Sequence, residues 1–77
     1  MPKHPVVSGR ELIRAVKHIG WETLRQRGSH VTLVNWDTGK TVPVPVHGSR
    51  PLPSGTLAEI LRQMDISYDE LRELLGK

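Results

Sequence analysis

The stretch that decides the fold is residues 25–34, which read Arg25-Gln26-Arg27-Gly28-Ser29-His30-Val31-Thr32-Leu33-Val34. Gly28-Ser29 provides a two-residue turn with glycine at its first central position, where a positive φ is required. The flanking residues have the composition of strands, so the stretch predicts a β-hairpin. Side chains that face each other across this hairpin share one side of the sheet; these are the pairs Arg27–His30 and Arg25–Thr32.

The same register extends toward the open end of the hairpin. There it pairs Thr23 with Val34 and Trp21 with Trp36. The opposite side of the hairpin then carries apolar residues, which can pack under helices: Leu24, Val31 and Leu33.

A second turn, Asp37-Thr38-Gly39-Lys40, leads into a third strand. With Thr38-Gly39 at its centre, the register places His47 opposite His30. Three valines of the third strand then join the apolar side of the hairpin: Val42, Val44 and Val46. This agreement across three strands supports the register. The third strand is expected at the edge of the sheet, because two of its residues lack an N–H group along one side: Pro43 and Pro45.

Helices are predicted on both sides of these strands. The capping box Ser8–Glu11 begins a helix over residues 9–19, which Gly20 ends. A second helix has Ser54 or, with the better capping box, Thr56 with Glu59 as its N-cap, and Asp65 follows it where a glycine is usual. A third runs from the capping box Ser67–Glu70 to Leu75. The order is α-β-β-β-α-α, an α+β fold with a three-stranded antiparallel sheet and helices on one of its faces.

Composition sets further limits. Seventy-seven residues make a single domain (1–77), which begins with an extended, proline-containing tail over residues 1–7. The chain has no cysteine, no apolar run long enough to span a membrane and no signal-peptide pattern, so we expect a cytoplasmic protein.

Positive charge is concentrated in the first part of the chain. Residues 1–50 carry eight basic and three acidic residues, a net charge of +5, whereas residues 51–77 carry three basic and five acidic residues, a net charge of −2. This asymmetry indicates a polyanionic partner, of which nucleic acid is the usual one. A basic surface kept for solubility is the plainer alternative.

The hairpin carries the residues suited to cleavage of RNA. Imidazole moves protons near neutral pH, and RNA supplies its own nucleophile, the 2′-hydroxyl group. His30 is the candidate base, Arg27 or Arg25 the cation that stabilises the phosphorane, and His47 the candidate acid, although the two histidines could exchange roles. A histidine that only begins a strand is the structural alternative.

Other polar residues are secondary candidates. Ser29, Lys40 and Arg50 could contact phosphates, while Trp21 and Trp36 either stack on unpaired bases or close the hairpin as a structural pair. His4 and His18 are assigned no role. The four histidines lack the spacing of metal ligands, so we expect neither a metal nor another cofactor.

Several of these segments together resemble the HicA (YcfA-like) toxins, which are mRNA interferases of type II toxin–antitoxin systems. The similarity covers about residues 5–75, and Gly28-Ser29-His30 after a basic strand is its most specific part; the other matching segments are 8–11, 20–22, 44–47, 55–57 and 60–61. It implies a double-stranded-RNA-binding-domain-like fold, metal-independent cleavage of RNA by His30, and inhibition by a HicB-like antitoxin. Trp21 stands where the family usually has Phe or Tyr.

Two other classes of protein share some of these features. A non-catalytic double-stranded-RNA-binding module has the same topology, but usually begins its last helix with a lysine cluster. Here the corresponding segment, residues 55–59, contains no basic residue. A pure protein-interaction domain would leave the cluster of Arg25, Arg27 and His30 unexplained.

Overall fold

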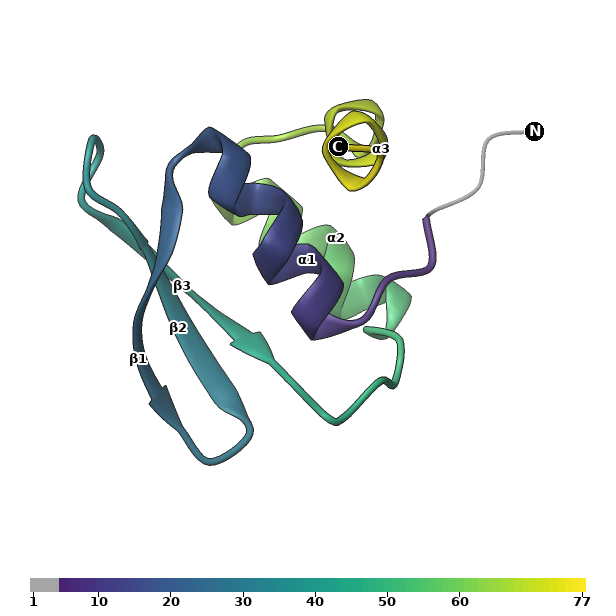
Figure 1. Cartoon of the computed structure of the whole chain (residues 1–77), viewed down its shortest axis with the longest axis horizontal. Coiled ribbons are helices and arrows are strands. Elements are labelled where there is room, and N and C mark those ends of the chain that lie inside the picture. The colour runs from purple at the N-terminus through teal and green to yellow at the C-terminus, as the bar shows by residue number, and fades with distance from the viewer. Residues whose placement is uncertain (1–4) are drawn as a thin grey trace.

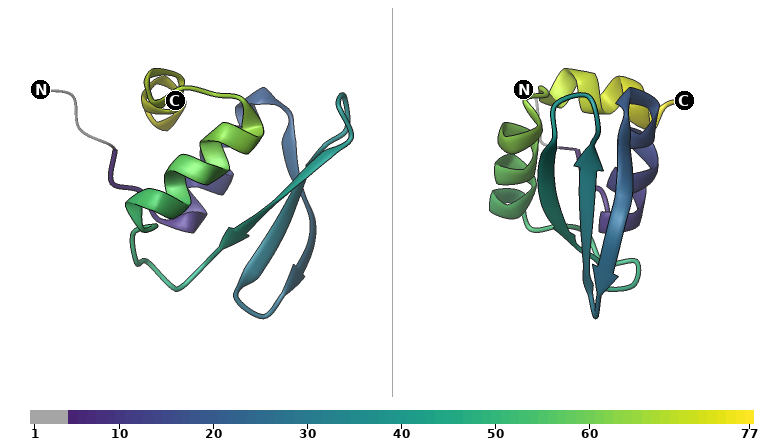
Figure 2. Two further views of the ribbon diagram at one scale, coloured as in Figure 1. Left: turned by 180° about the vertical axis from the view of Figure 1, so that it is seen from behind. Right: turned by 90° about the vertical axis from the view of Figure 1, so that its left-hand side faces the viewer.

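The computed structural model describes residues 5–77, so His4 and most of the predicted tail lie outside the described residues. The predicted order of elements is confirmed: α1 (Gly9–Val16) with a 3₁₀ turn η1 (Lys17–Ile19), β1 (Trp21–Arg27), β2 (His30–Asn35), β3 (Lys40–Pro45), α2 (Ser54–Met64) and α3 (Tyr68–Leu75). The strands form one antiparallel sheet in the order β1-β2-β3. The helices lie on one side of the sheet (Figure 1), and its other face is not covered by any helix (Figure 2).

The hydrophobic core lies between the sheet and the helices. α1 contacts β1 and α3, while α2 contacts β3, so each outer strand has a helix beneath it. The most deeply buried side chains come from the three α-helices and from β2 and β3: Leu12, Val16, Leu33, Val42, Val44, Leu57 and Leu71. No helix within residues 5–77 is long and apolar enough to cross a membrane.

The predicted start and end of α1 are confirmed. The Ser8 hydroxyl accepts a hydrogen bond from the Glu11 amide (3.2 Å), and the Glu11 carboxylate accepts one from the Ser8 amide (2.8 Å). Gly20 ends the helical segment with φ of 96°. Val7, the last residue of the predicted tail, packs against the domain: its side chain is buried, and its carbonyl accepts a hydrogen bond from the Leu52 amide (2.7 Å).

The ends of α2 correct one prediction. The helix begins at Ser54 with Pro53 as its N-cap and no side-chain hydrogen bond, so both predicted caps, Ser54 and Thr56, are wrong. Asp65 ends α2 in the left-handed region, with φ of 61°, as an aspartate can. The next capping box is confirmed, because the Ser67 hydroxyl accepts a hydrogen bond from the Glu70 amide at 3.1 Å.

A β-bulge in β1 overturns the predicted pairing beyond Arg25. Leu24 is the extra residue, so Thr23 pairs with Leu33 and Trp21 with Asn35, not with Val34 and Trp36. The bulge turns Trp21 toward the core, where 3% of its surface is exposed, and leaves Leu24 at 38%. Leu24 was expected in the core. Burying the larger indole removes more apolar area from water, which favours this arrangement.

The turn between β2 and β3 is longer than predicted. Asn35 pairs with Lys40, so four residues connect the strands instead of two. The Asn35 side chain accepts a hydrogen bond from the Asp37 amide (3.0 Å), and the Asn35 carbonyl accepts one from the Gly39 amide (2.7 Å). The register therefore shifts by two residues and places Pro45, not His47, opposite His30.

A shift of two residues keeps every side chain of β3 on its predicted face, because side chains alternate with a period of two. Val42 and Val44 accordingly lie in the core, and Val46 packs beside it just beyond the strand. β3 is an edge strand, as its two prolines predict.

The start of α1 packs against the end of β3 so closely that it requires glycine. A Cβ atom on Gly9 would lie far inside van der Waals contact with the Pro45 carbonyl oxygen, and 3.1 Å from a methyl group of Val46. Gly55, in the first turn of α2, has no neighbouring atom in the corresponding position within 4 Å. These two glycines make a matched pair for testing this contact.

We predict that Gly9→Ala lowers the free energy of unfolding by about 1–3 kcal/mol, because α1 and β3 must separate to admit the methyl group. Gly55→Ala should leave it unchanged or raise it by up to about 1 kcal/mol, since alanine restricts the unfolded chain. Urea unfolding followed by circular dichroism measures both. Equal stability of the two variants would show that the contact between α1 and β3 does not constrain the fold.

Candidate functional site

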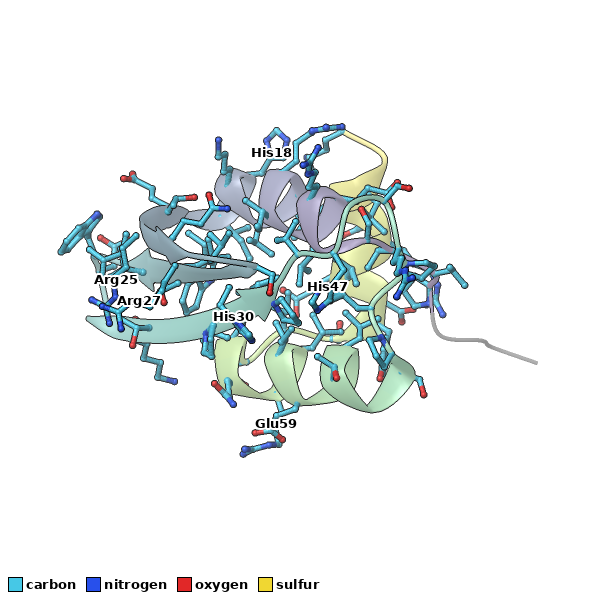
Figure 3. The ribbon with its side chains drawn as sticks, turned by 90° about the horizontal axis from the view of Figure 1, so that it is seen from below. His18, Arg25, Arg27, His30, His47 and Glu59 are labelled. Carbon is cyan, nitrogen blue, oxygen red and sulfur yellow. The ribbon has the colours of Figure 1, made fainter. Side chains whose placement is uncertain are left out.

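Four predicted residues line one shallow hollow on the uncovered face of the sheet. They are Arg25 and Arg27 of β1 and His30 and Thr32 of β2, and the hollow has a volume of about 530 Å³. The pairing Arg27–His30 and Arg25–Thr32 places them side by side, as predicted. Figure 3 shows His30 between the two arginines and His47.

The backbone of the first turn holds His30 at a defined position. Gly28 has φ of 60°, the positive value that the turn requires, and no neighbour within 4 Å of a Cβ atom there. The Gln26 side chain donates a hydrogen bond to the Gly28 carbonyl (3.2 Å), and the Ser29 carbonyl accepts one from the Val46 amide (2.6 Å). The turn is thus tied to the segment after β3, and His30 begins a fully paired strand.

The arginines leave their charge available to a ligand. Arg25 and Arg27 are exposed, and neither forms an ion pair with another residue in the 5–77 range. A guanidinium group presents several N–H donors in one plane and can bind two oxygens of a phosphate together. The hollow therefore combines free anion-binding groups with an imidazole.

A second hollow meets the first at His30. It lies between β3 and α2, and its polar wall includes Glu59. Hydrogen bonds from Arg62 and Gln63 lower the pKa of Glu59 from 4.5 to about 2, so this group is a carboxylate at neutral pH. Its charge is offset by the Arg62 guanidinium group, with which it forms an ion pair, so the unpaired positive charge at this site lies on the β1 side, at Arg25 and Arg27.

Sequence reasoning did not assign Glu59 to the site. The sequence around Glu59 contains one recognisable pattern, the spacing Glu59–Arg62, which places opposite charges one turn apart on a helix. That spacing predicts the ion pair, which α2 indeed contains. The spacing does not predict that Glu59 lines the same hollow as His30. That proximity follows from the packing of α2 against β3.

The structure does not place His47 where the sequence analysis expected it. Because His30 pairs with Pro45, His47 lies two residues beyond the end of β3, level with the turn at Gly28. Among residues 5–77, His47 lines neither hollow at His30. The register argument for a histidine pair is therefore wrong, and its physical cause is the four-residue turn at Asn35.

Two further candidates lie away from the hollow. Lys40 pairs with Asn35 at the other end of β2, roughly 17 Å along the strand from His30. Arg50 is exposed in the loop before α2, where its amide donates a hydrogen bond to the His47 carbonyl at 3.1 Å. Ser29, by contrast, adjoins His30 in the turn itself.

The two tryptophans have separate environments. Trp21 is buried in the core, so the prediction that bases could stack on it is wrong. Trp36, 64% exposed, lies in the turn between β2 and β3. The predicted indole pair therefore does not form, because the bulge at Leu24 turns Trp21 to the helix side.

The chain was also compared with known proteins. The model of the family described as the HicA toxin of bacterial toxin–antitoxin systems matches residues 9–66, from the first residue of α1 to just beyond α2. No match is found among curated proteins. The matched segment contains the whole sheet and every residue that lines the two hollows at His30. The chain therefore belongs to the HicA family of bacterial toxins.

Proposed function

We propose that this toxin is a metal-independent endoribonuclease in which His30 moves the proton of the reacting hydroxyl group. The observation that carries the proposal is the hollow shared by Arg25, Arg27 and His30 on the uncovered face of the sheet. This hollow joins a group that can transfer protons to groups that can bind a phosphate. It is open enough to accept a polymer, since no helix covers it.

The reaction uses the nucleophile that RNA itself carries. His30 takes the proton of a 2′-hydroxyl group as its oxygen bonds to the adjacent phosphorus atom. The bond from phosphorus to the 5′ oxygen breaks, so one fragment ends in a 2′,3′-cyclic phosphate and the other in a 5′-hydroxyl group. The guanidinium groups of Arg25 and Arg27 stabilise the negative charge that develops on the phosphoryl oxygens. The Ser29 hydroxyl is a further candidate contact to the phosphate.

The leaving 5′ oxygen also needs a proton. The candidate donors are the His47 imidazole and water. The register of β3 favours water, because His47 is not paired with His30 and does not line the hollow. Lys40 and Arg50 lie outside the hollow, and we assign them to capture of the RNA chain rather than to the reacting phosphate.

The partner that restrains this activity is proposed to be a HicB-like antitoxin in the cytoplasm. Family membership implies a toxin–antitoxin partner. The uncovered face carries the unpaired charges of Arg25 and Arg27, so an inhibitor that covers it with acidic groups would block the hollow and neutralise the arginines. RNA and antitoxin would then compete for one surface.

A non-catalytic double-stranded-RNA-binding module is the alternative class. Such modules place basic side chains at the start of the helix corresponding to α2. In this chain the first turn of α2 has no basic residue, and Arg62 near its end is bound to Glu59. The charge distribution of α2 therefore favours the ribonuclease.

We predict that His30→Ala reduces cleavage of single-stranded RNA in the presence of EDTA by about 10²–10⁴-fold, the usual contribution of a positioned proton-transfer group. His18→Ala is the matched control, because His18 is also exposed but lies on η1, away from the hollow. It should cleave at the wild-type rate. Full activity of His30→Ala, or loss of wild-type activity in EDTA, would contradict the proposal.

A second prediction concerns the acid. His47→Ala should retain most of the cleavage rate at every pH between 5 and 9, since water serves as the proton donor. Loss of a positioned general acid would instead cost about 10²–10⁴-fold and remove one limb of the pH–rate profile. That result would show that His47 is the general acid that protonates the leaving 5′ oxygen.

A further inference from the structure

A second cationic surface lies in a groove between α1 and β1, away from His30. The groove has a volume of about 320 Å³. Its helix side carries three basic residues, Arg10, Arg14 and Lys17, and its floor and opposite wall are formed by Ile13, Thr23, Gln26, Val31 and Val46. No carboxylate lines it. The proposed reaction does not use any of its basic residues.

The three basic residues recur at intervals of four and three, so they follow one stripe along the helix. From Arg10 to Lys17 this stripe spans about 10 Å. All three side chains are exposed, and none forms an ion pair in the described part of the chain. Their charges are therefore available to an anionic polymer lying in the groove.

The groove and the site at His30 lie on opposite sides of β1. Gln26 faces the groove, while its neighbours Arg25 and Arg27 line the hollow. The strand is at the edge of the sheet, so nothing separates the two surfaces except β1 itself. Basic residues thus lie on both sides of β1: Arg25 and Arg27 beside His30, and the three basic residues along the groove.

We propose that one single-stranded RNA binds both surfaces: its cleaved phosphate lies at His30, and its continuation bends round β1 into the groove of α1. This inference rests on the proposed function, because it extends the same substrate beyond the hollow. A single strand can make the bend, whereas a duplex is too stiff to follow both faces of one strand of a sheet. The apolar floor at Ile13 and Val46 can contact bases while the basic stripe contacts phosphates.

The test measures binding separately from cleavage. The probe is a fluorescein-labelled single-stranded RNA of about 12 nucleotides, within the range of single-strand binding sites. Its affinity for the His30→Ala protein is measured by fluorescence anisotropy at several salt concentrations. The first test variant adds Arg10→Gln and Arg14→Gln, and the second adds Lys17→Gln. The control for the second adds Arg72→Gln, which removes the same single charge from α3.

Each phosphate contact to a single strand contributes about 0.7 to the slope of log affinity against log salt. Because the Arg10→Gln, Arg14→Gln variant loses two such contacts, its slope should be about 1.4 smaller in magnitude, and its affinity near 0.1 M salt about 10–30-fold lower. The Arg72→Gln control should change affinity by less than about twofold, because Arg72 lies on α3 outside the groove and forms an ion pair with Asp69. Lys17→Gln alone, which leaves the first turn of α1 intact, should still lower the slope by about 0.7.

In the protein that retains His30, the Arg10→Gln, Arg14→Gln variant should raise KM for RNA and leave kcat unchanged, because it removes binding distant from the reaction. Equal loss of affinity in the Lys17→Gln and Arg72→Gln variants would overturn the proposal, as would an unchanged salt slope. Weakened binding of polyglutamate with unchanged binding of RNA would also overturn it, and would assign the groove to an acidic protein. None of these outcomes depends on whether His30 is catalytic.

Discussion

The β-bulge at Leu24 sets which residues of β1 face the helices and which face the uncovered side of the sheet. On one side of the bulge, Trp21 is buried in the core and Thr23 lines the groove beside α1; on the other, Arg25 and Arg27 face outward beside His30. One extra residue thus lets β1 supply a buried indole and an exposed pair of guanidinium groups. A strand without it would place Trp21 and the arginines on the same face.

As a result, the two ends of β1 have different roles: one packs in the core, and the other forms part of the candidate site. The tryptophan end fixes β1 to the core, and the arginine end is left without ion pairs. Placing unpaired cations beside a histidine costs some stability, because their charges repel one another, but it provides an anion site that requires no rearrangement. On the α2 side, Glu59 is paired with Arg62, so that side adds no net charge to the site. The unpaired positive charge of the site therefore lies on the arginines.

Local patterns in the sequence predicted much of this arrangement. The capping boxes of Ser8 and Ser67, the turn at Gly28 and the pairs next to it follow from residues close together in the chain. The core face of β3 was also predicted, because an error of two residues does not exchange the faces.

The rest depends on contacts between distant segments. The bulge follows from burial of Trp21 under the helices, and hydrophobic alternation within β1 does not reveal it. The four-residue turn follows from the hydrogen bonds of Asn35, which outweigh the preference for Gly39 in a two-residue loop. That turn separated His47 from His30. Likewise, only the packing of α2 on β3 brings Glu59 to the site.

The central claim is that the RNA's own 2′-hydroxyl group attacks the phosphate held at His30. It is tested most directly by an RNA whose cleavage site has been mapped and then resynthesised with a single 2′-deoxynucleotide 5′ to the cleaved bond. The account predicts that this bond is no longer cut, while the unmodified RNA yields a 2′,3′-cyclic phosphate and a 5′-hydroxyl end. Cleavage of the modified bond, or 5′-phosphate ends on the natural RNA, would contradict it.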